Sequence, residues 1–135
     1  MACQSRSFRV ERNVWSDGTT NTPGLYHSIL RLKRSEWAKA RLSLITEAAS
    51  SANLTVSSAA AYGDEESDFD SPTVVAFPAT PTSVTGNNTS WGSEYAAFDA
   101  AKQQVDIGVR CVNINSSSKM EHVRVTIVVD VSEEA

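Results

Sequence analysis

Histidine, cysteine and clustered glycine are scarce in this chain, and each shortage excludes a kind of chemistry. The two histidines, His27 and His122, have no second ligand at the spacing of a zinc motif. The six glycines stand singly, without the close spacing of a phosphate-binding loop, and no Gly-x-Ser-x-Gly motif is present. We therefore expect a protein that is not an enzyme and that holds neither a metal ion nor a cofactor.

Long apolar segments are also missing. No run approaches the roughly 20 apolar residues that cross a bilayer. Met1 to Val10 mix charged and polar residues where an export signal would be apolar. The two cysteines, Cys3 and Cys111, are too few for a disulfide scaffold, so we expect free thiols in a reducing compartment and no contact with a membrane.

The size and composition are those of a small folded protein. The chain has 135 residues, of which 41% are hydrophobic and 21% charged, close to the averages for globular domains. One domain over 1–135 is expected, with a polar N-terminal arm at 1–7 and an acidic loop at 63–72. The acidic run has two carboxylates at alternate positions but lacks the glycine and the distal glutamate of a calcium loop, which favours a solvated loop.

Charge is unevenly distributed along the sequence. Residues 1–41 carry eight basic and three acidic side chains, a balance of +5, whereas 42–135 carry four basic and thirteen acidic ones, a balance of −9. Such a division predicts either ion pairing within the domain or attraction between copies, the basic part of one meeting the acidic part of another. A simple mixture of charges on the surface is the alternative.

Alternating apolar residues over 105–131 are the clearest structural signal. Every second side chain is apolar over 105–112 and again over 123–131, with a polar loop between, which predicts a long antiparallel hairpin. Each arm would extend near 30 Å at about 3.3 Å per residue, against an average strand of about five or six residues. A small chain covers so large a sheet poorly, so pairing between copies is expected.

The N-terminal third predicts a second hairpin and a helix. Residues 8–15 and 25–32 read as strands that pair across a turn-rich loop at 16–24. Ser35 is placed as the cap of a helix that continues through Ala49, because apolar residues recur there at helical spacing. The alternative is a strand over 40–46, where Leu42 and Leu44 also alternate with polar neighbours.

Two further segments have weaker patterns. Residues 73–77 are a short edge-strand candidate between prolines, and 94–104 contain either a helix capped by Ser93 or a strand over 95–98. The fold class expected is mainly β within the α+β type: a large antiparallel sheet with one or two short helices, ending in the long hairpin.

Five residues are expected at contacts between subunits. The tryptophans suit a core or an interface, although a stacking platform for a sugar or nucleobase is an alternative. Val112 and Val128 are expected on the mixed outer face of the hairpin, and loops 16–24 and 63–71 are expected to touch neighbouring subunits. The interface candidates are Trp15, Trp37, Trp91, Val112 and Val128.

The segment 105–131, with Val105-Asp-Ile-Gly-Val-Arg-Cys-Val and His122-Val-Arg-Val-Thr-Ile-Val-Val-Asp-Val, resembles the central hairpin of single-stranded RNA phage coat proteins. In that family the hairpin belongs to a sheet that spans a dimer and faces the genome. The resemblance implies that Arg110, Arg124 and Thr126 face RNA. The predicted helix precedes this hairpin instead of following it, so the resemblance also implies a rearranged topology.

In length, in Ser/Thr/Ala/Val content and in its polar arm, the chain is also similar to the capsid decoration, cement and tail proteins of tailed phages. Both resemblances imply a virion structural protein that self-assembles in the host cytoplasm, with copies of itself, other virion proteins and genomic RNA as partners. A monomeric β-sandwich that binds a ligand through Trp15, Trp91 and nearby loops is the alternative from another class, and a small enzyme is the third.

Overall fold

The computed structural model describes residues 4–16, 25–47, 54–77, 83–85, 90–113 and 121–133, and this part of the chain is almost entirely β structure. The strands are β1 (Ser5–Trp15), β2 (Leu25–Lys33), β3 (Lys39–Glu47), β4 (Leu54–Gly63), β5 (Val74–Ala76), β6 (Ser83–Thr85), β7 (Ser90–Gly92), β8 (Ala96–Ala97), β9 (Gln104–Asn113) and β10 (His122–Ser132). A single 3-10 turn, η1 (Glu66–Phe69), is the one helical element in the described ranges.

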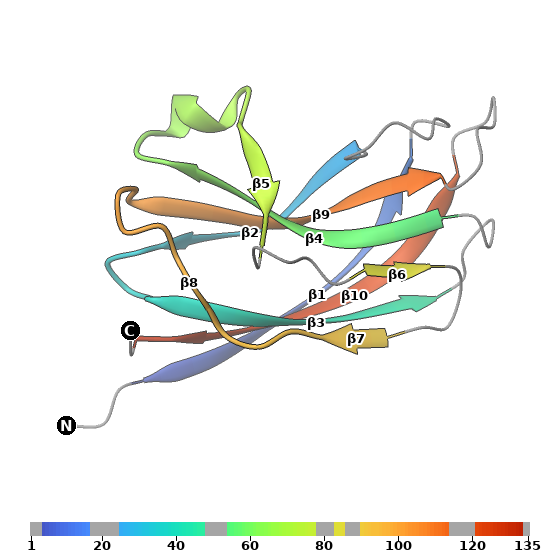
Figure 1. Cartoon of the computed structure of the whole chain (residues 1–135), viewed down its shortest axis with the longest axis horizontal. Coiled ribbons are helices and arrows are strands. Elements are labelled where there is room, and N and C mark those ends of the chain that lie inside the picture. The colour runs from blue at the N-terminus through green and yellow to red at the C-terminus, as the bar shows by residue number, and fades with distance from the viewer. Residues whose placement is uncertain are drawn as a thin grey trace.

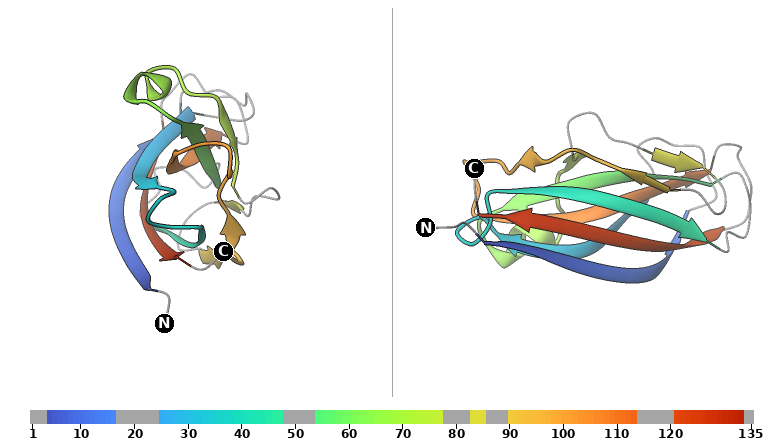
Figure 2. Two further views of the ribbon diagram at one scale, coloured as in Figure 1. Left: turned by 90° about the vertical axis from the view of Figure 1, so that its left-hand side faces the viewer. Right: turned by 90° about the horizontal axis from the view of Figure 1, so that it is seen from below.

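Two antiparallel sheets pack face to face (Figures 1 and 2). Sheet A has the strand order β1-β10-β3-β7, and β8 also pairs with β3. Sheet B has the order β2-β9-β4-β5, and β6 also pairs with β4. The mainly β fold class with antiparallel pairing is confirmed, but it consists of two sheets instead of one.

The chain passes back and forth between the sheets. β5 and β6 lie on the same side of β4, and β7 and β8 lie on the same side of β3, so each pair acts as one interrupted edge strand. If each of these pairs is counted as one strand and the eight strands are renumbered in chain order, the strand order is 1-8-3-6 in sheet A and 2-7-4-5 in sheet B. This connectivity is that of the jelly roll, a two-sheet sandwich built from two Greek keys.

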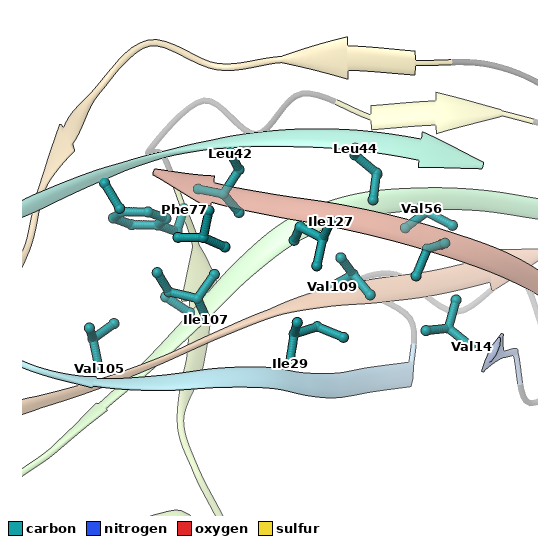
Figure 3. Packing of buried hydrophobic residues seen from close by; sticks show 14 of the residues in the cluster. Val14, Ile29, Leu42, Leu44, Val56, Phe77, Val105, Ile107, Val109 and Ile127 are labelled. Atoms are coloured by element: carbon teal, nitrogen blue, oxygen red, sulfur yellow. The ribbon is translucent and has the colours of Figure 1, made fainter. Parts of the chain in front are cut away.

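The hydrophobic core lies between the sheets and is made largely of branched aliphatic side chains. β9 and β10 bury every second residue toward it, as their alternation predicts. Figure 3 shows side chains from opposing strands meeting across the gap. Labelled members of this cluster are Val14, Ile29, Leu42, Leu44, Val56, Phe77, Val105, Ile107, Val109 and Ile127.

The helix expected from Ser35 to Ala49 is wrong, and the alternative strand is confirmed. Lys39–Glu47 forms β3, in which Ala40, Leu42 and Leu44 are completely buried. These alternate positions face the core, so the period of two overrides the helical spacing that the same residues also satisfy. The ambiguous segment 94–104 contains the short strand β8, and residues 73–77 contain the edge strand β5.

Both expected hairpins are also corrected. β1 pairs with β10 and β2 with β9, so the strands at 8–15 and 25–32 belong to different sheets. The arms of the long hairpin, β9 and β10, likewise lie in opposite sheets. Alternation identifies the face of a strand that is buried but not its neighbour, and two strands that bury the same core from opposite sides have the same pattern as a hairpin. The resemblance to RNA phage coat proteins therefore loses the hairpin on which it rested.

Candidate assembly surface

Strand β1 forms a long open edge of the sandwich. All eleven of its residues pair with β10 on one side, and no described strand pairs with its other side. β2 holds the same edge position in sheet B, and Figure 2 shows β1 running along the side of the molecule. Unpaired edges of this length invite pairing with another strand.

The backbone groups at this edge can be assigned by residue number. The N–H of Trp15 donates to Nε2 of His27, over 3.0 Å, on β2, so it points away from β10. In an antiparallel ladder, successive residues direct their N–H and C=O groups alternately toward and away from the partner. The register of β1 with β10 is continuous, so the odd residues from Ser7 to Asn13 direct their backbone groups to the open edge.

Two side chains link the edge strands of the two sheets. Arg12 on β1 donates from Nη1 to the carbonyl oxygen of Ser28 on β2 over 2.7 Å. His27 on β2 accepts from the N–H of Trp15, and its Nε2 lies 2.8 Å from the Trp15 carbonyl oxygen. These contacts connect the two sheets at this side of the sandwich, and the backbone groups of Trp15 are already bound by His27. The edge between Ser7 and Asn13 stays open to a partner strand.

Charged side chains form a network on the outer face of β1 and β10. Glu11 accepts from Arg124 on β10 over 3.0 Å and lies 3.3 Å from Arg9 on its own strand. The hydrogen bonds from Arg124 and then Arg9 lower the pKa of Glu11 below its ordinary value. Arg9 and Glu11 thus form a pair of opposite charges on one face of the edge strand.

A second network lies nearer the start of β1. Asp130 on β10 accepts from the hydroxyl of Ser7 and from Arg41 on β3, the latter over 2.9 Å. The bond from Ser7, followed by that from Arg41, lowers the pKa of Asp130. Arg41 also lies 5.0 Å from the centre of the Tyr95 ring, and Lys39 lies 5.2 Å from it. The carboxylates of this face are therefore held ionised next to cations.

Apolar side chains are also exposed on sheet A. Trp15 is 40% exposed and lies 4.7 Å, centroid to centroid, from the ring of His122. Ile45 is 37% exposed on β3, beside the outward positions of β10, where Val128 is half-buried. Exposed aromatic and aliphatic groups among charges are typical of protein interfaces.

Part of the outer face of sheet B, around Asp106, is covered by the molecule's own side chains. Asp106 on β9 is only 3% exposed, and it accepts hydrogen bonds from Tyr26 over 2.9 Å and from Ser28 over 2.7 Å. Arg31 lies 4.0 Å from the same carboxylate. Burial, and next the charge of Asp106, raise the pKa of Tyr26 well above its ordinary range.

The acidic segment 63–72 extends this cover. Arg31 lies over the ring of Phe69 in η1 at 3.9 Å and pairs with Glu66 over 2.7 Å. Asp64 pairs with Lys102 over 3.5 Å. Asp68 accepts from the backbone N–H groups of residues 64 and 65, which lowers its pKa. Part of this acidic segment is therefore paired within its own domain.

The structure separates the predicted interface residues. Trp37 is 9% exposed and belongs to the core. Trp91 on β7 pairs with the inward-facing Leu44, and its Nε1 is buried without a hydrogen-bond partner in the described part of the chain. Trp15 lies at the opposite edge of sheet A, so Trp15 and Trp91 form no common platform. Val112 and Val128 are half-buried on sheets B and A respectively.

The residues that the phage resemblance assigned to RNA are not on one face. Arg110 lies on β9 of sheet B and donates to the carbonyl oxygen of Val74 over 2.6 Å, whereas Arg124 and Thr126 lie on β10 of sheet A. Thr126 is only 5% exposed. These three do not form a contiguous RNA-facing surface.

The contacts at the β1 edge are difficult to recognise from the sequence. Arg9, Glu11, Arg12 and His27 read as ordinary polar positions of two strands. The available signal is the Arg9-x-Glu11 spacing, because residues two apart in a strand share a face. Their relation to an open edge depends on the pairing of β1 with β10, which alternation does not reveal.

Within the described ranges, no group of three or more His, Cys, Asp or Glu side chains is placed to hold a metal ion. The same residues contain no helix with the length and apolar character needed to cross a membrane. Cys111 is a buried free thiol. Loop 16–24, apart from Ser16, lies outside the described residues.

Comparisons with known proteins agree with the fold. No family model matches the chain, and no curated protein matches it in sequence. Among solved structures, it is similar to the crystal structure of the infectious bursal disease virus VP2 subviral particle, with a TM-score of 0.52 and 8% identity. The match covers 96% of this chain and 32% of that one, so the chain spans about a third of the VP2 chain. The chain therefore has a jelly-roll fold like that of a viral capsid protein.

Proposed function

We propose that this chain is a non-enzymatic structural subunit of a virion that assembles with copies of itself into a shell. The observation that carries this proposal is the long open edge of β1, an eleven-residue strand of a jelly roll that pairs with β10 alone among the described strands. The similarity to the VP2 subviral particle over 96% of the chain supports it through the fold.

An unpaired strand edge is a physical reason for the chain to assemble. A monomer that leaves an eleven-residue edge strand in water exposes a template for uncontrolled aggregation. Closed symmetric assembly removes the edge because each subunit completes its neighbour in a fixed geometry. The charged pairs on β1 and β10 determine the register of such contacts and contribute less to the affinity between subunits.

The finer role is that of a coat protein, which locates the chain in the virion after assembly in the host cytoplasm. A tailed-phage decoration, cement or tail role is the alternative within the same class. Genomic RNA and other virion proteins are further proposed partners. Three cationic side chains, Arg9, Lys39 and Arg41, lie at outward positions of β1 and β3 and support a contact with phosphate.

The test combines light scattering after size exclusion with negative-stain electron microscopy of the purified full chain. We expect particles or multimers whose mass is a multiple of 14.6 kDa. Nuclease treatment followed by absorbance at 260 and 280 nm separates particles filled with nucleic acid from protein shells. A species of 14.6 kDa at every concentration contradicts the proposal.

A matched pair of variants ties assembly to the edge. The N–H of Asn13 faces the open side of β1, so Asn13→Pro removes a donor from the edge without removing a ladder bond to β10. Asn13→Ala keeps that donor. We expect Asn13→Pro to lose assembly while its circular dichroism stays that of Asn13→Ala, and equal assembly of the two contradicts an edge contact.

A further inference from the structure

We infer that β1 pairs with β1 of a second copy, antiparallel, about a two-fold axis beside Val10. The inference rests on the proposed self-association and specifies its first contact. In this register Arg9 lies opposite Glu11 of the second copy, and Glu11 lies opposite Arg9, so the two-fold axis generates the pair twice. Sheet A then continues across the two copies.

Charge selects this register among its neighbours. Moving the axis to Arg9 or to Glu11 places two like charges directly opposite each other, which destabilises a cross-strand pair. An axis at Arg12 opposes that arginine with itself. An axis at Phe8 sets Arg9 against Ser7 and leaves Glu11 opposite Ser5. The axis at Val10 alone among these opposes Arg9 with Glu11.

The backbone agrees with the same register. The odd residues from Ser7 to Asn13 direct their N–H and C=O groups to the open edge. With the axis at Val10, odd residues meet odd residues: Arg9 meets Glu11 and Ser7 meets Asn13. Each such pair exchanges two backbone hydrogen bonds. Pairing ends before Trp15, because His27 already accepts from its N–H.

The inner side of the edge is compatible with this contact. A charge that points inward on an edge strand usually opposes pairing, and Arg12 is such a charge because it shares its side of β1 with the buried Val14. It is already bound to the carbonyl oxygen of Ser28. In the proposed register Arg12 lies opposite Phe8 of the second copy, whose ring is a face for a guanidinium group, as Arg6 lies over Phe8 at 4.7 Å within one chain.

Cysteine cross-linking tests the register directly. In a Cys3→Ser background, Val10→Cys places two thiols at a directly opposed, non-hydrogen-bonded position, where the Cα atoms are about 4.5 Å apart, within the range for disulfides. We expect more than half of this variant to become a disulfide dimer under copper-phenanthroline and oxygen. Cys111 is buried and stays out of the reaction.

Arg9→Cys and Glu11→Cys, in the same background, are the matched controls. Each alone separates the two thiols by two residues along the strand, beyond disulfide reach, so we expect little cross-linking. When the two variants are mixed, the thiol introduced by Arg9→Cys in one copy lies opposite the thiol introduced by Glu11→Cys in the other. Cross-linking of the mixture should rise at least fivefold over either variant alone.

The outcomes separate this inference from the proposed shell. If particles form but Val10→Cys gives no disulfide dimer, and the mixture of Arg9→Cys and Glu11→Cys cross-links no more than either variant alone, the β1 contact is wrong and the structural role stands. If the cross-links form in the stated pattern but no larger assembly appears under any condition, the dimer stands and the shell is wrong. Efficient cross-linking of Arg9→Cys by itself overturns the register.

Discussion

The hydroxyl of Tyr26 donates a hydrogen bond to the carboxylate of Asp106 over 2.9 Å, and the Tyr26 ring lies against Gly108 on the same strand as Asp106. This contact belongs to the covered part of the outer face of sheet B. On this face, polar side chains of sheet B are satisfied within the molecule, whereas the β1 edge of sheet A has no partner strand among the described residues. The two surfaces therefore predict different responses to substitution.

Replacing Asp106 should destabilise the monomer. Asp106→Ala removes the buried carboxylate that accepts from Tyr26 and Ser28 and leaves the Tyr26 hydroxyl only the backbone carbonyl oxygen of residue 106, at 3.1 Å. We expect the free energy of unfolding to fall by about 2 kcal/mol. Urea unfolding followed by tryptophan fluorescence measures it. Glu47→Ala, at an exposed position of β3, is the control and should change stability by less than about 0.5 kcal/mol. Equal losses in the two variants would contradict the buried network.

Substitution by alanine should have opposite effects on stability at two strand glycines, Gly108 and Gly92. A Cβ at residue 108 would stand 2.1 Å from the backbone oxygen of His27 and 2.8 Å from the Tyr26 ring, whereas at Gly92 the nearest atom is 3.7 Å away. We expect Gly108→Ala to cost about 3 kcal/mol and Gly92→Ala to be neutral or stabilising by about 0.5 kcal/mol. Thermal unfolding of both variants checks this, and a tolerated Gly108→Ala would show that β2 and β9 are not so closely packed.

Cys111 should be unreactive in the folded protein. Burial alone raises the pKa of its thiol to about 12, so little thiolate is present near neutral pH and the sulfur is inaccessible. A Cys3→Ser variant treated with iodoacetamide at pH 8 should show no added mass by mass spectrometry. In 6 M guanidinium chloride the same variant should add one label. Rapid labelling without denaturant would contradict the position of β9 in the core.

Acid should weaken the β1–β10 contact. Hydrogen bonds to arginine and serine lower the pKa of Glu11 and Asp130 from their ordinary values of 4.5 and 3.8. A lowered folded-state pKa means that the stabilisation is present above these values and is lost as the pH falls below them. The melting temperature should therefore decline between pH 5 and pH 3, and Glu11→Gln should show a smaller decline. An identical pH profile for this variant would contradict the Glu11 network.

The sequence predicted where strands occur better than it predicted which strands pair with each other. Alternation identified the buried faces of β9 and β10, because Val109 and Ile127 must face the core wherever their strands lie. It did not show that these strands occupy opposite sheets. That outcome depends on long-range pairings such as Phe8 with Val129, which leave no local signature.

The assembly surface could not be predicted from the sequence because its position depends on which strands pair. Trp37 and Trp91 are interface candidates by residue type, and the structure directs both toward the core, since burial of a large aromatic ring is favoured wherever space allows. Arg9 and Glu11 are visible as a charged pair in the sequence. Their importance follows from the edge position of β1, which only the sheet order reveals.

Amide hydrogen exchange along β1 is the most direct test that a second copy completes this edge. Exchange of the full chain is followed by NMR at low and high protein concentration. The account predicts that the amides of Ser7, Arg9, Glu11 and Asn13 exchange rapidly in dilute monomer and become at least tenfold slower on association, whereas those of Phe8, Val10 and Arg12 are protected in both. Fast exchange of the odd-numbered amides in the assembled protein would contradict it.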